Sequence, residues 1–291
     1  MKGYHAEKAA LRRHAGEGTA PRAGLGKTLK KYSGYYALLF IPVLYFILFK
    51  YLPMIGNVLA FRRYSPLNPI FGKEWVGLYY MNMFLTSADF WRRFFNTIFL
   101  SVVTLAFCFP LPIVFALLLN EFTNVRFKKL VQTISYLPHF ISVVIIVGII
   151  SQLLSYNTGV VNSLLKSLGG EAVPFLTSPG WFRTIYVSSE LWAKLGWNAI
   201  IYIAALSGVN TELYEAAVID GANRWKQTVY ITIPGIMPTI IITLVLSMGG
   251  LISVGYEKVL LLANPLNKDT ADVISTYVYQ LGIVDQNYSF S

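Results

Sequence analysis

Long apolar runs separated by polar segments dominate this chain of 291 residues. A helix needs about 20 apolar residues to cross roughly 30 Å of hydrocarbon, and five runs reach that length. They lie at 34–54, 96–119, 131–154, 183–207 and 237–262. The pattern predicts an all-α integral membrane protein with five visible transmembrane helices, in which residues 34–291 form the transmembrane domain.

Basic residues predict the orientation of these spans. Residues 1–33 hold eight basic side chains against two acidic ones, and the 120–130 segment is also basic. Because Lys and Arg are enriched in cytoplasmic loops, both segments are expected in the cytoplasm, the first as an unstructured tail. The 208–236 loop then lies inside, and the 55–95 and 155–182 segments lie outside. The basic residues within 55–95 work against that placement.

An odd number of spans affects the end of the chain. With the N-terminus in the cytoplasm, five spans leave the C-terminus outside, and the sequence stops at Ser291 directly after an outer segment. We therefore expect the complete protein to contain a sixth helix, which returns inward and which this sequence lacks.

Composition excludes several classes of function. Only 13% of the residues are charged, whereas soluble domains have about 25%. The topology signal and attraction to anionic membrane lipid explain the net charge of +10, so nucleic-acid binding is not expected. The three histidines and Cys108 form no metal-binding motif, and no Gly-x4-Gly-Lys-Ser/Thr loop occurs. We therefore expect this chain to hold neither a metal nor a nucleotide.

The 208–236 segment is more elaborate than a simple connection between spans. Asn210 or Thr211 can cap a short helix, and Gly221 permits a positive φ where the chain bends. Pro234 is expected to stop a second short helix. From these residues alone, the segment is either a docking element for a soluble partner or an amphipathic loop that covers helix ends.

The spacing within this segment resembles a signature of ABC-importer permeases, E-A-A-x3-G-x9-I-x-L-P. The matching residues are Glu215, Ala216, Ala217, Gly221, Ile231 and Pro234. Asp220 before the glycine is also common in that family. The one departure is Ile233 in place of leucine, which preserves the apolar volume.

The resemblance implies that this loop contains a cytoplasmic coupling helix. In such permeases the helix sits in a groove of the ATP-hydrolysing subunit. Carried over by position, Glu215 would contact the ATPase, and Ala216 and Ala217 would pack into its groove. Asp220 and Gly221 would form the turn that follows.

Further short sequence segments are similar to the carbohydrate-uptake branch of these permeases, the maltose-type, binding-protein-dependent family. They lie at 96–97, 110–112, 136–140, 196–206 and 253–262. The sequences of these segments are most similar to those of permeases for oligosaccharides derived from polysaccharides, some of them uronate-rich. The resemblance implies a multi-pass protein of the bacterial inner membrane that moves an oligosaccharide by alternating access. Its implied partners are a second related permease, two copies of an ABC ATPase that hold ATP and Mg, and an extracytoplasmic solute-binding protein.

Candidate residues for the sugar route lie on the fourth and fifth runs. Glu190 and Lys194 are rare charged residues within a span, four positions apart, so they either pair with each other or line the route. Gly255 lets the fifth run unwind around a cavity or approach a neighbour closely. Lys258, toward the outer end of that run, is expected to be solvated. Side chains suited to sugar rings and hydroxyls are Trp192, Trp197, Asn198, Tyr202 and Tyr256. The same residue types also form membrane-interface belts, so both interpretations stay open.

Two other functions are alternatives. An ABC permease for an amino acid, a peptide or phosphate would carry the same coupling signature. A membrane enzyme would start from Asp220-Gly221-x-x-Arg224, which is similar to part of the metal-binding frame of lipid-headgroup transferases. Those enzymes need further aspartates at helical spacing, and none follow here. We therefore predict a transport subunit without catalytic residues.

Overall fold

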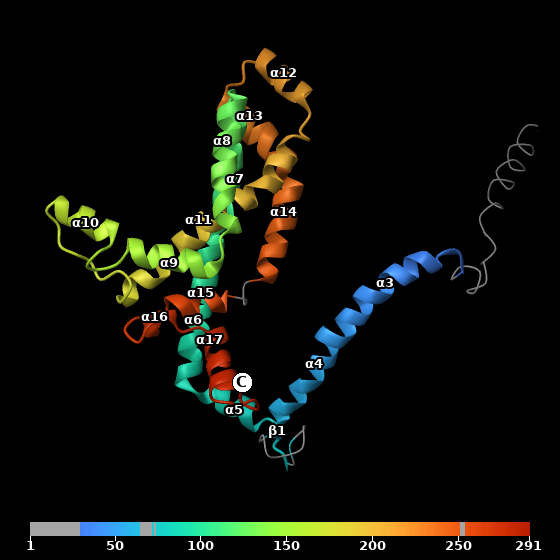
Figure 1. Cartoon of the computed structure of the whole chain (residues 1–291). Coiled ribbons are helices and arrows are strands. Elements are labelled where there is room, and N and C mark those ends of the chain that lie inside the picture. Colours follow the sequence, from blue (N-terminus) through green and yellow to red (C-terminus); the bar gives the residue numbers. More distant parts are fainter. Residues whose placement is uncertain (1–29, 65–71, 73, 251–253) are drawn as a thin grey trace, which may run out of the picture. The chain divides into compact units, whose positions relative to one another are not determined.

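The computed structural model describes residues 30–64, 72, 74–250 and 254–291 of the chain (Figure 1). The predicted basic tail therefore lies almost wholly outside the described residues. Contacts divide the chain into two units, Met1–Trp75 and Val76–Ser291. Helices dominate both units, which confirms the predicted all-α class.

The first unit is a long apolar helix that ends in a small hairpin. Its elements are α3 (Ser33–Phe46), the π-helical turn η1 (Ile47–Tyr51), α4 (Leu52–Met54), the 3-10 helix η2 (Ile55–Phe61), β1 (Arg62–Arg63) and β2 (Glu74–Trp75). The two strands pair antiparallel, and an ion pair of 3.2 Å joins Arg63 to Glu74 across them. The helical part is exposed and apolar on every side, as expected for a helix surrounded by lipid.

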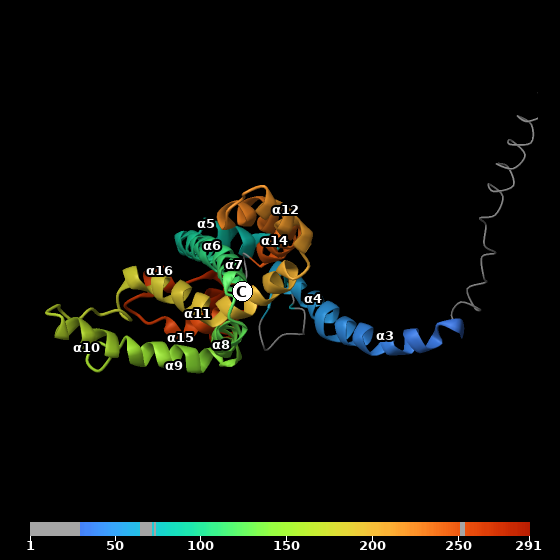
Figure 2. The same ribbon diagram turned by 90° about the horizontal axis from the view of Figure 1, so that it is seen from above.

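The second unit is built around one long helix, α11 (Pro179–Leu206). The other helices of this unit are α5 (Tyr79–Thr86), α6 (Ala88–Cys108), α7 (Pro110–Glu121), α8 (Val125–Tyr136), η3 (Leu137–Phe140), α9 (Val143–Leu153), α10 (Val160–Ser167), α12 (Thr211–Ile219), α13 (Arg224–Gln227), η4 (Thr228–Thr232), α14 (Ile233–Gly249), α15 (Tyr256–Leu262), α16 (Lys268–Ala271), α17 (Ile274–Tyr279) and η5 (Gln280–Val284). Helix α11 runs between α6 and α7 on one side and α8 and α9 on the other (Figure 2). It thereby contributes to both hydrophobic clusters of this unit.

The five predicted spans are only partly matched by helices able to cross a membrane. Among the described residues, three helices are long and apolar enough: Ser33–Phe61, Ala88–Glu121 and Arg224–Gly249. A fourth is obtained if the bent pair Val125–Phe140 and Val143–Leu153 is taken as one span. The count of five is therefore not confirmed. Helix α11, which contains the predicted 183–207 span, is long but carries three charged residues.

The predicted 131–154 span is two helices that meet at 103°. Helix α8 ends in the 3-10 turn η3, which holds Pro138 near its start. The side chain of Ser142 then accepts a hydrogen bond of 3.4 Å from the backbone N–H of Ile145 and caps α9. A proline followed by an N-cap serine is a local signal for a helix boundary. The continuous apolar character of the run concealed it.

The predicted 237–262 span is also divided. Helix α14 ends at Gly249, and α15 begins at Tyr256 as a separate helix. Residues 251–253 lie outside the described part of the chain. A Cβ atom on Gly249 would meet nothing within 4 Å, so this glycine marks the end of a helix and not a close helix contact. Glycine raises the free energy of a helix interior, which explains the break at this point.

Pro234 does not stop a helix, contrary to the sequence prediction. The helix continues from Arg224 to Gly249. The π-helical turn η4 lies directly before the proline, and there the N–H of Ile233 donates to the carbonyl of Thr228, five residues back. This wider turn lets the proline ring follow without the clash that it causes in a regular α-helix.

Close packing of α11 against α8 depends on Gly196. A Cβ atom built on this glycine would overlap the backbone carbonyl of Ser135. We expect Gly196→Ala to force the two helices apart and to destabilise the protein by about 1–3 kcal/mol, measured as a lower midpoint of thermal unfolding in detergent. Gly148→Ala is the matched control, because a Cβ atom there meets nothing within 4 Å. Equal midpoints for the two variants would contradict this packing.

Candidate functional site

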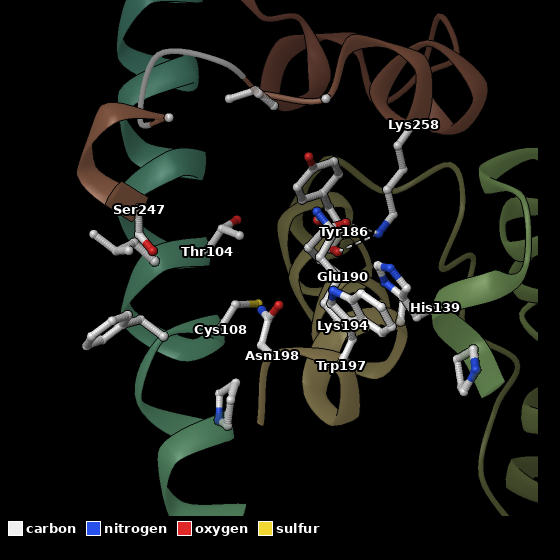
Figure 3. Close-up of a pocket in the computed structure, with 18 of the residues that line it drawn as sticks. Thr104, Cys108, His139, Tyr186, Glu190, Lys194, Trp197, Asn198, Ser247 and Lys258 are labelled. Carbon is white, nitrogen blue, oxygen red and sulfur yellow. Dashed lines mark hydrogen bonds and ion pairs between the residues drawn. The ribbon is translucent and has the colours of Figure 1, made fainter. Parts of the chain in front are cut away.

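A cavity of about 750 Å³ opens in the second unit, between α11 and the helices around it. Its walls come from α6 and α7, the turn between α8 and α9, α11, and both sides of the break between α14 and α15. This volume falls within the range of roughly 300–1,000 Å³ that is typical of small-molecule sites. Figure 3 shows the side chains that converge on it.

Six of the eight candidate residues for the sugar route line this cavity. Glu190, Lys194, Asn198 and Tyr202 follow one another at intervals of four along α11, and Gly255 precedes α15. An interval of four keeps side chains on neighbouring turns of one helix face, which is why α11 can present all four to the same space. The Tyr202 hydroxyl also makes a hydrogen bond of 3.0 Å with the Thr243 hydroxyl of α14.

The other two predicted residues do not line the cavity. Trp192 lies two positions after Glu190 on α11 and is largely exposed. Tyr256 stacks on Tyr279, with ring centroids 5.9 Å apart. Trp197 of α11 does line the cavity and stacks on the ring of His139, with centroids 4.3 Å apart and ring planes 6° from parallel.

A three-residue ion cluster forms the charged wall of the cavity. Glu190 pairs with Lys194 on its own helix, as its position four residues earlier predicted. The second oxygen of the same carboxylate accepts a hydrogen bond of 2.9 Å from Lys258 of α15. The predicted solvation of Lys258 is therefore wrong, because this residue is only 5% exposed. Its partner lies 68 positions away, and the break before α15 brings the two together, so no local signal could have revealed the pair.

A second polar network fixes the segment after α15 onto α6. Arg93 donates a hydrogen bond of 2.7 Å to Asp272, and both side chains are 9% exposed. Asn96 donates to the backbone carbonyls of Asp269 and Asp272 and accepts a hydrogen bond from Arg183 of α11. The sequence holds no local signal for this network, because its partners lie more than 80 positions apart.

The 208–236 loop has the first helix and the turn that its sequence predicts, whereas the helix after the turn continues past Pro234. Asn210 caps α12, since its side chain accepts a hydrogen bond of 3.0 Å from the N–H of Glu212. Gly221 has φ of +74°, which confirms the predicted turn. The N–H of Ala222 closes this turn by donating to the carbonyl of Ala217, a common helix C-terminal motif.

Most of the residues in this loop that match the coupling signature are accessible. Glu215, Ala216, Asp220 and Gly221 are exposed, and Ala217 is half-buried. Helix α12 lies at one end of the second unit, away from α15 and α17 (Figure 1). An ion pair of 3.2 Å between Arg224 and Glu121 holds the start of α13 to the end of α7.

Residues 84–289 match the family described as binding-protein-dependent transport system inner membrane component. The chain belongs to this family of ABC-transporter permeases. Its members are transport subunits and not enzymes, and they lie in the inner membrane with several membrane-spanning helices.

Sequence similarity to known proteins extends over most of the length of this permease. It is 43% identical to Protein LplB of Bacillus subtilis, over 90% of this chain and 83% of that protein. It is also 43% identical to the polygalacturonan/rhamnogalacturonan transport system permease protein YteP of Bacillus subtilis, over 88% of this chain and 80% of that protein. Both relatives match close to nine tenths of this chain.

A solved structure resembles this permease in fold and in sequence. It is the crystal structure of a bacterial ABC transporter involved in the import of the acidic polysaccharide alginate, with a TM-score of 0.85 and 43% identity over 91% of this chain and 90% of that chain. A second structure, of the alginate transporter in complex with an alginate pentasaccharide-bound periplasmic protein, matches with the same score.

Proposed function

We propose that this chain is the permease subunit of an ATP-driven importer for acidic, uronate-containing oligosaccharides. The observation that carries the proposal is the cavity, where the half-exposed ammonium group of Lys194 and the aromatic surface of Trp197 lie together. Aromatic faces suit the apolar side of sugar rings, and ammonium groups suit carboxylates. The names of two relatives, for polygalacturonan and for alginate, agree with this substrate class.

The proposed assembly contains more than this chain. A second related permease would complete the transport pathway, and two copies of an ABC ATPase would hydrolyse ATP with bound Mg. A solute-binding protein outside the membrane would deliver the oligosaccharide, as the alginate complex with its periplasmic protein supports. In this arrangement the N-terminus and the 208–236 loop face the cytoplasm.

The loop would transmit the motion of the ATPases. Glu215 and Ala216 are exposed for contact with an ATPase, Ala217 lies at the edge of that contact, and Asp220 and Gly221 set the angle of the following chain. Closing of the ATPases would then reorient the bundle, and the cavity would open alternately to either side of the membrane. Bound nucleotide and the docked solute-binding protein would bias this two-state equilibrium.

Substrate-stimulated ATP hydrolysis tests this function. The complete transporter, reconstituted with its solute-binding protein, is given oligogalacturonate, oligoalginate or a neutral oligosaccharide of equal length. We expect the acidic sugars to stimulate hydrolysis several-fold more than the neutral one, because only they carry a carboxylate that can pair with the half-exposed ammonium group of Lys194. Stimulation by the neutral sugar alone would refute the assignment to acidic sugars.

A further inference from the structure

The two lysines that contact Glu190 are held very differently. Lys258 donates to the Glu190 carboxylate at 2.9 Å and to the backbone carbonyl of Tyr186 at 3.4 Å, and its ammonium group lies 4.9 Å from the centre of the Tyr186 ring. Its side chain is 6% exposed. This lysine is fixed by three contacts in a buried position.

Lys194 makes fewer contacts than Lys258. The ion pair with Glu190 is the one polar contact that it makes with the described residues, and half of its side chain is exposed. Figure 3 shows it beside Trp197 and Asn198 on the cavity side of α11. A lysine ammonium has three donors, so two of those on Lys194 are free for a ligand.

Glu190 remains compensated if Lys194 leaves it. Removing one member of a buried pair normally strands the other charge, which is strongly unfavourable. Here the carboxylate uses one oxygen for each lysine, and the contact with Lys258 persists when Lys194 moves away. Lys194 can therefore exchange Glu190 for another carboxylate without leaving a buried charge unpaired.

We propose that Lys194 leaves Glu190 and binds a free carboxylate of a uronate ring in its place. This permease would then select de-esterified over methyl-esterified uronate oligosaccharides. The inference rests on the proposed function and names its substrate more closely. A methyl ester carries no charge, so it cannot replace Glu190 as the ionic partner of Lys194.

The remaining polar groups of the cavity are consistent with such a ligand. Glu257 lines the cavity, is exposed, and makes no ion pair with any residue that the structure describes. A carboxylate accepts hydrogen bonds, so Glu257 suits the hydroxyl groups of a sugar and disfavours a second carboxylate beside it. The side-chain amide of Asn198 can donate and accept. The cavity thus has one position for an anion, at Lys194.

This selectivity has a consequence for the reactions before import. Pectic uronates carry methyl esters on part of their carboxyl groups, and hydrolysis of such an ester yields a free carboxylate and methanol. For the esterified part of such a polymer, the class of reaction that supplies the preferred substrate is ester hydrolysis outside the cell.

The test compares two sugars in one assay. Uptake of trigalacturonate and of its methyl ester is measured in proteoliposomes that contain the complete transporter and its solute-binding protein. The variants are Lys194→Gln, which removes the charge, and Lys194→Arg, which keeps it. Lys166→Gln is the matched control, because Lys166 is an exposed lysine on α10 and does not line the cavity.

The readout is the ratio of the uptake rate of the acid to that of the ester. Any preference of the solute-binding protein contributes equally to every variant and cancels when the ratios are compared. We expect Lys194→Gln to lower the ratio at least tenfold, and Lys194→Arg and Lys166→Gln to keep it within threefold of the wild type. An unchanged ratio in Lys194→Gln, whether both rates fall together or neither falls, overturns the inference. If the wild type imports neither trigalacturonate nor an alginate trisaccharide, the proposed function fails instead.

Discussion

Gly221→Val is expected to lower sugar uptake at least tenfold while the protein still inserts into the membrane. Gly221 has φ of +74°, a region that β-branched residues avoid. A Cβ atom at this position meets nothing within 4 Å, so the change introduces backbone strain without a steric clash. Such strain amounts to about 1–3 kcal/mol, enough to redirect the chain between α12 and α13 and to misplace the surface that we propose contacts the ATPase. Uptake into proteoliposomes and co-purification of the ATPase are the measurements.

Gly169→Val is a matched control for this effect. Gly169 has φ of +82°, and a Cβ atom there also meets nothing within 4 Å, but it lies in the turn after α10. The same strain at that turn should leave uptake close to the wild-type rate. Gly221→Asn should also retain most activity, because asparagine tolerates positive φ better than other residues. If Gly221→Val transports normally, the coupling role of this turn is wrong.

Arg93→Met is expected to destabilise the permease by about 3–5 kcal/mol, because it leaves Asp272 as an unpaired charge in a buried position. Arg93 also lies over the ring of Tyr277, with its guanidinium carbon 3.9 Å from the ring centre. Loss of both contacts should release the segment after α15 from α6. The measurement is the midpoint of thermal unfolding of the purified protein.

Arg92→Met, at the neighbouring position, is the control. Arg92 pairs with Asp89 at 3.1 Å and Asp269 at 3.5 Å, but these side chains are 44% to 78% exposed. Ion pairs at the surface contribute about 0–1 kcal/mol. The double change Arg93→Met with Asp272→Leu should be less harmful than Arg93→Met alone, since it removes both charges. Equal effects of Arg92→Met and Arg93→Met would show that the buried pair is not the cause.

Features set by neighbouring residues could be predicted from the sequence. The helix cap at Asn210 and the turn at Gly221 depend on residue types at adjacent positions, and both are present. The pairing of Glu190 with Lys194 depends on their interval of four on one helix. The apolar runs near the first two predicted spans are also long helices in the structure.

Features that depend on where the chain changes direction, namely helix breaks and the long-range contacts that they create, could not be predicted in the same way. Hydropathy remains high across Ser142 and across Gly249, so the pattern predicts one span in each run, although Ser142 caps the start of a new helix and α14 ends at Gly249. The break after Gly249 is the reason that Lys258 faces Glu190 and not solvent. Arg93 and Asp272 are likewise brought together only by the folded path of the chain.

In the proposed transport cycle, the continuous helix from Arg224 to Gly249 would act as a lever with unequal arms. Its pivot would be Ile236, which is 1% exposed and buried in the same cluster as Ala116 of α7 and Ala199 of α11. At 1.5 Å per residue, the arm from Ile236 to Arg224 measures roughly 18 Å, and the arm to Thr243 at the cavity roughly 10 Å. A displacement applied at the loop would reach the cavity reduced to a little over half, with the force increased in proportion. The helix would thus trade distance for force, which favours the separation of packed side chains around a bound sugar.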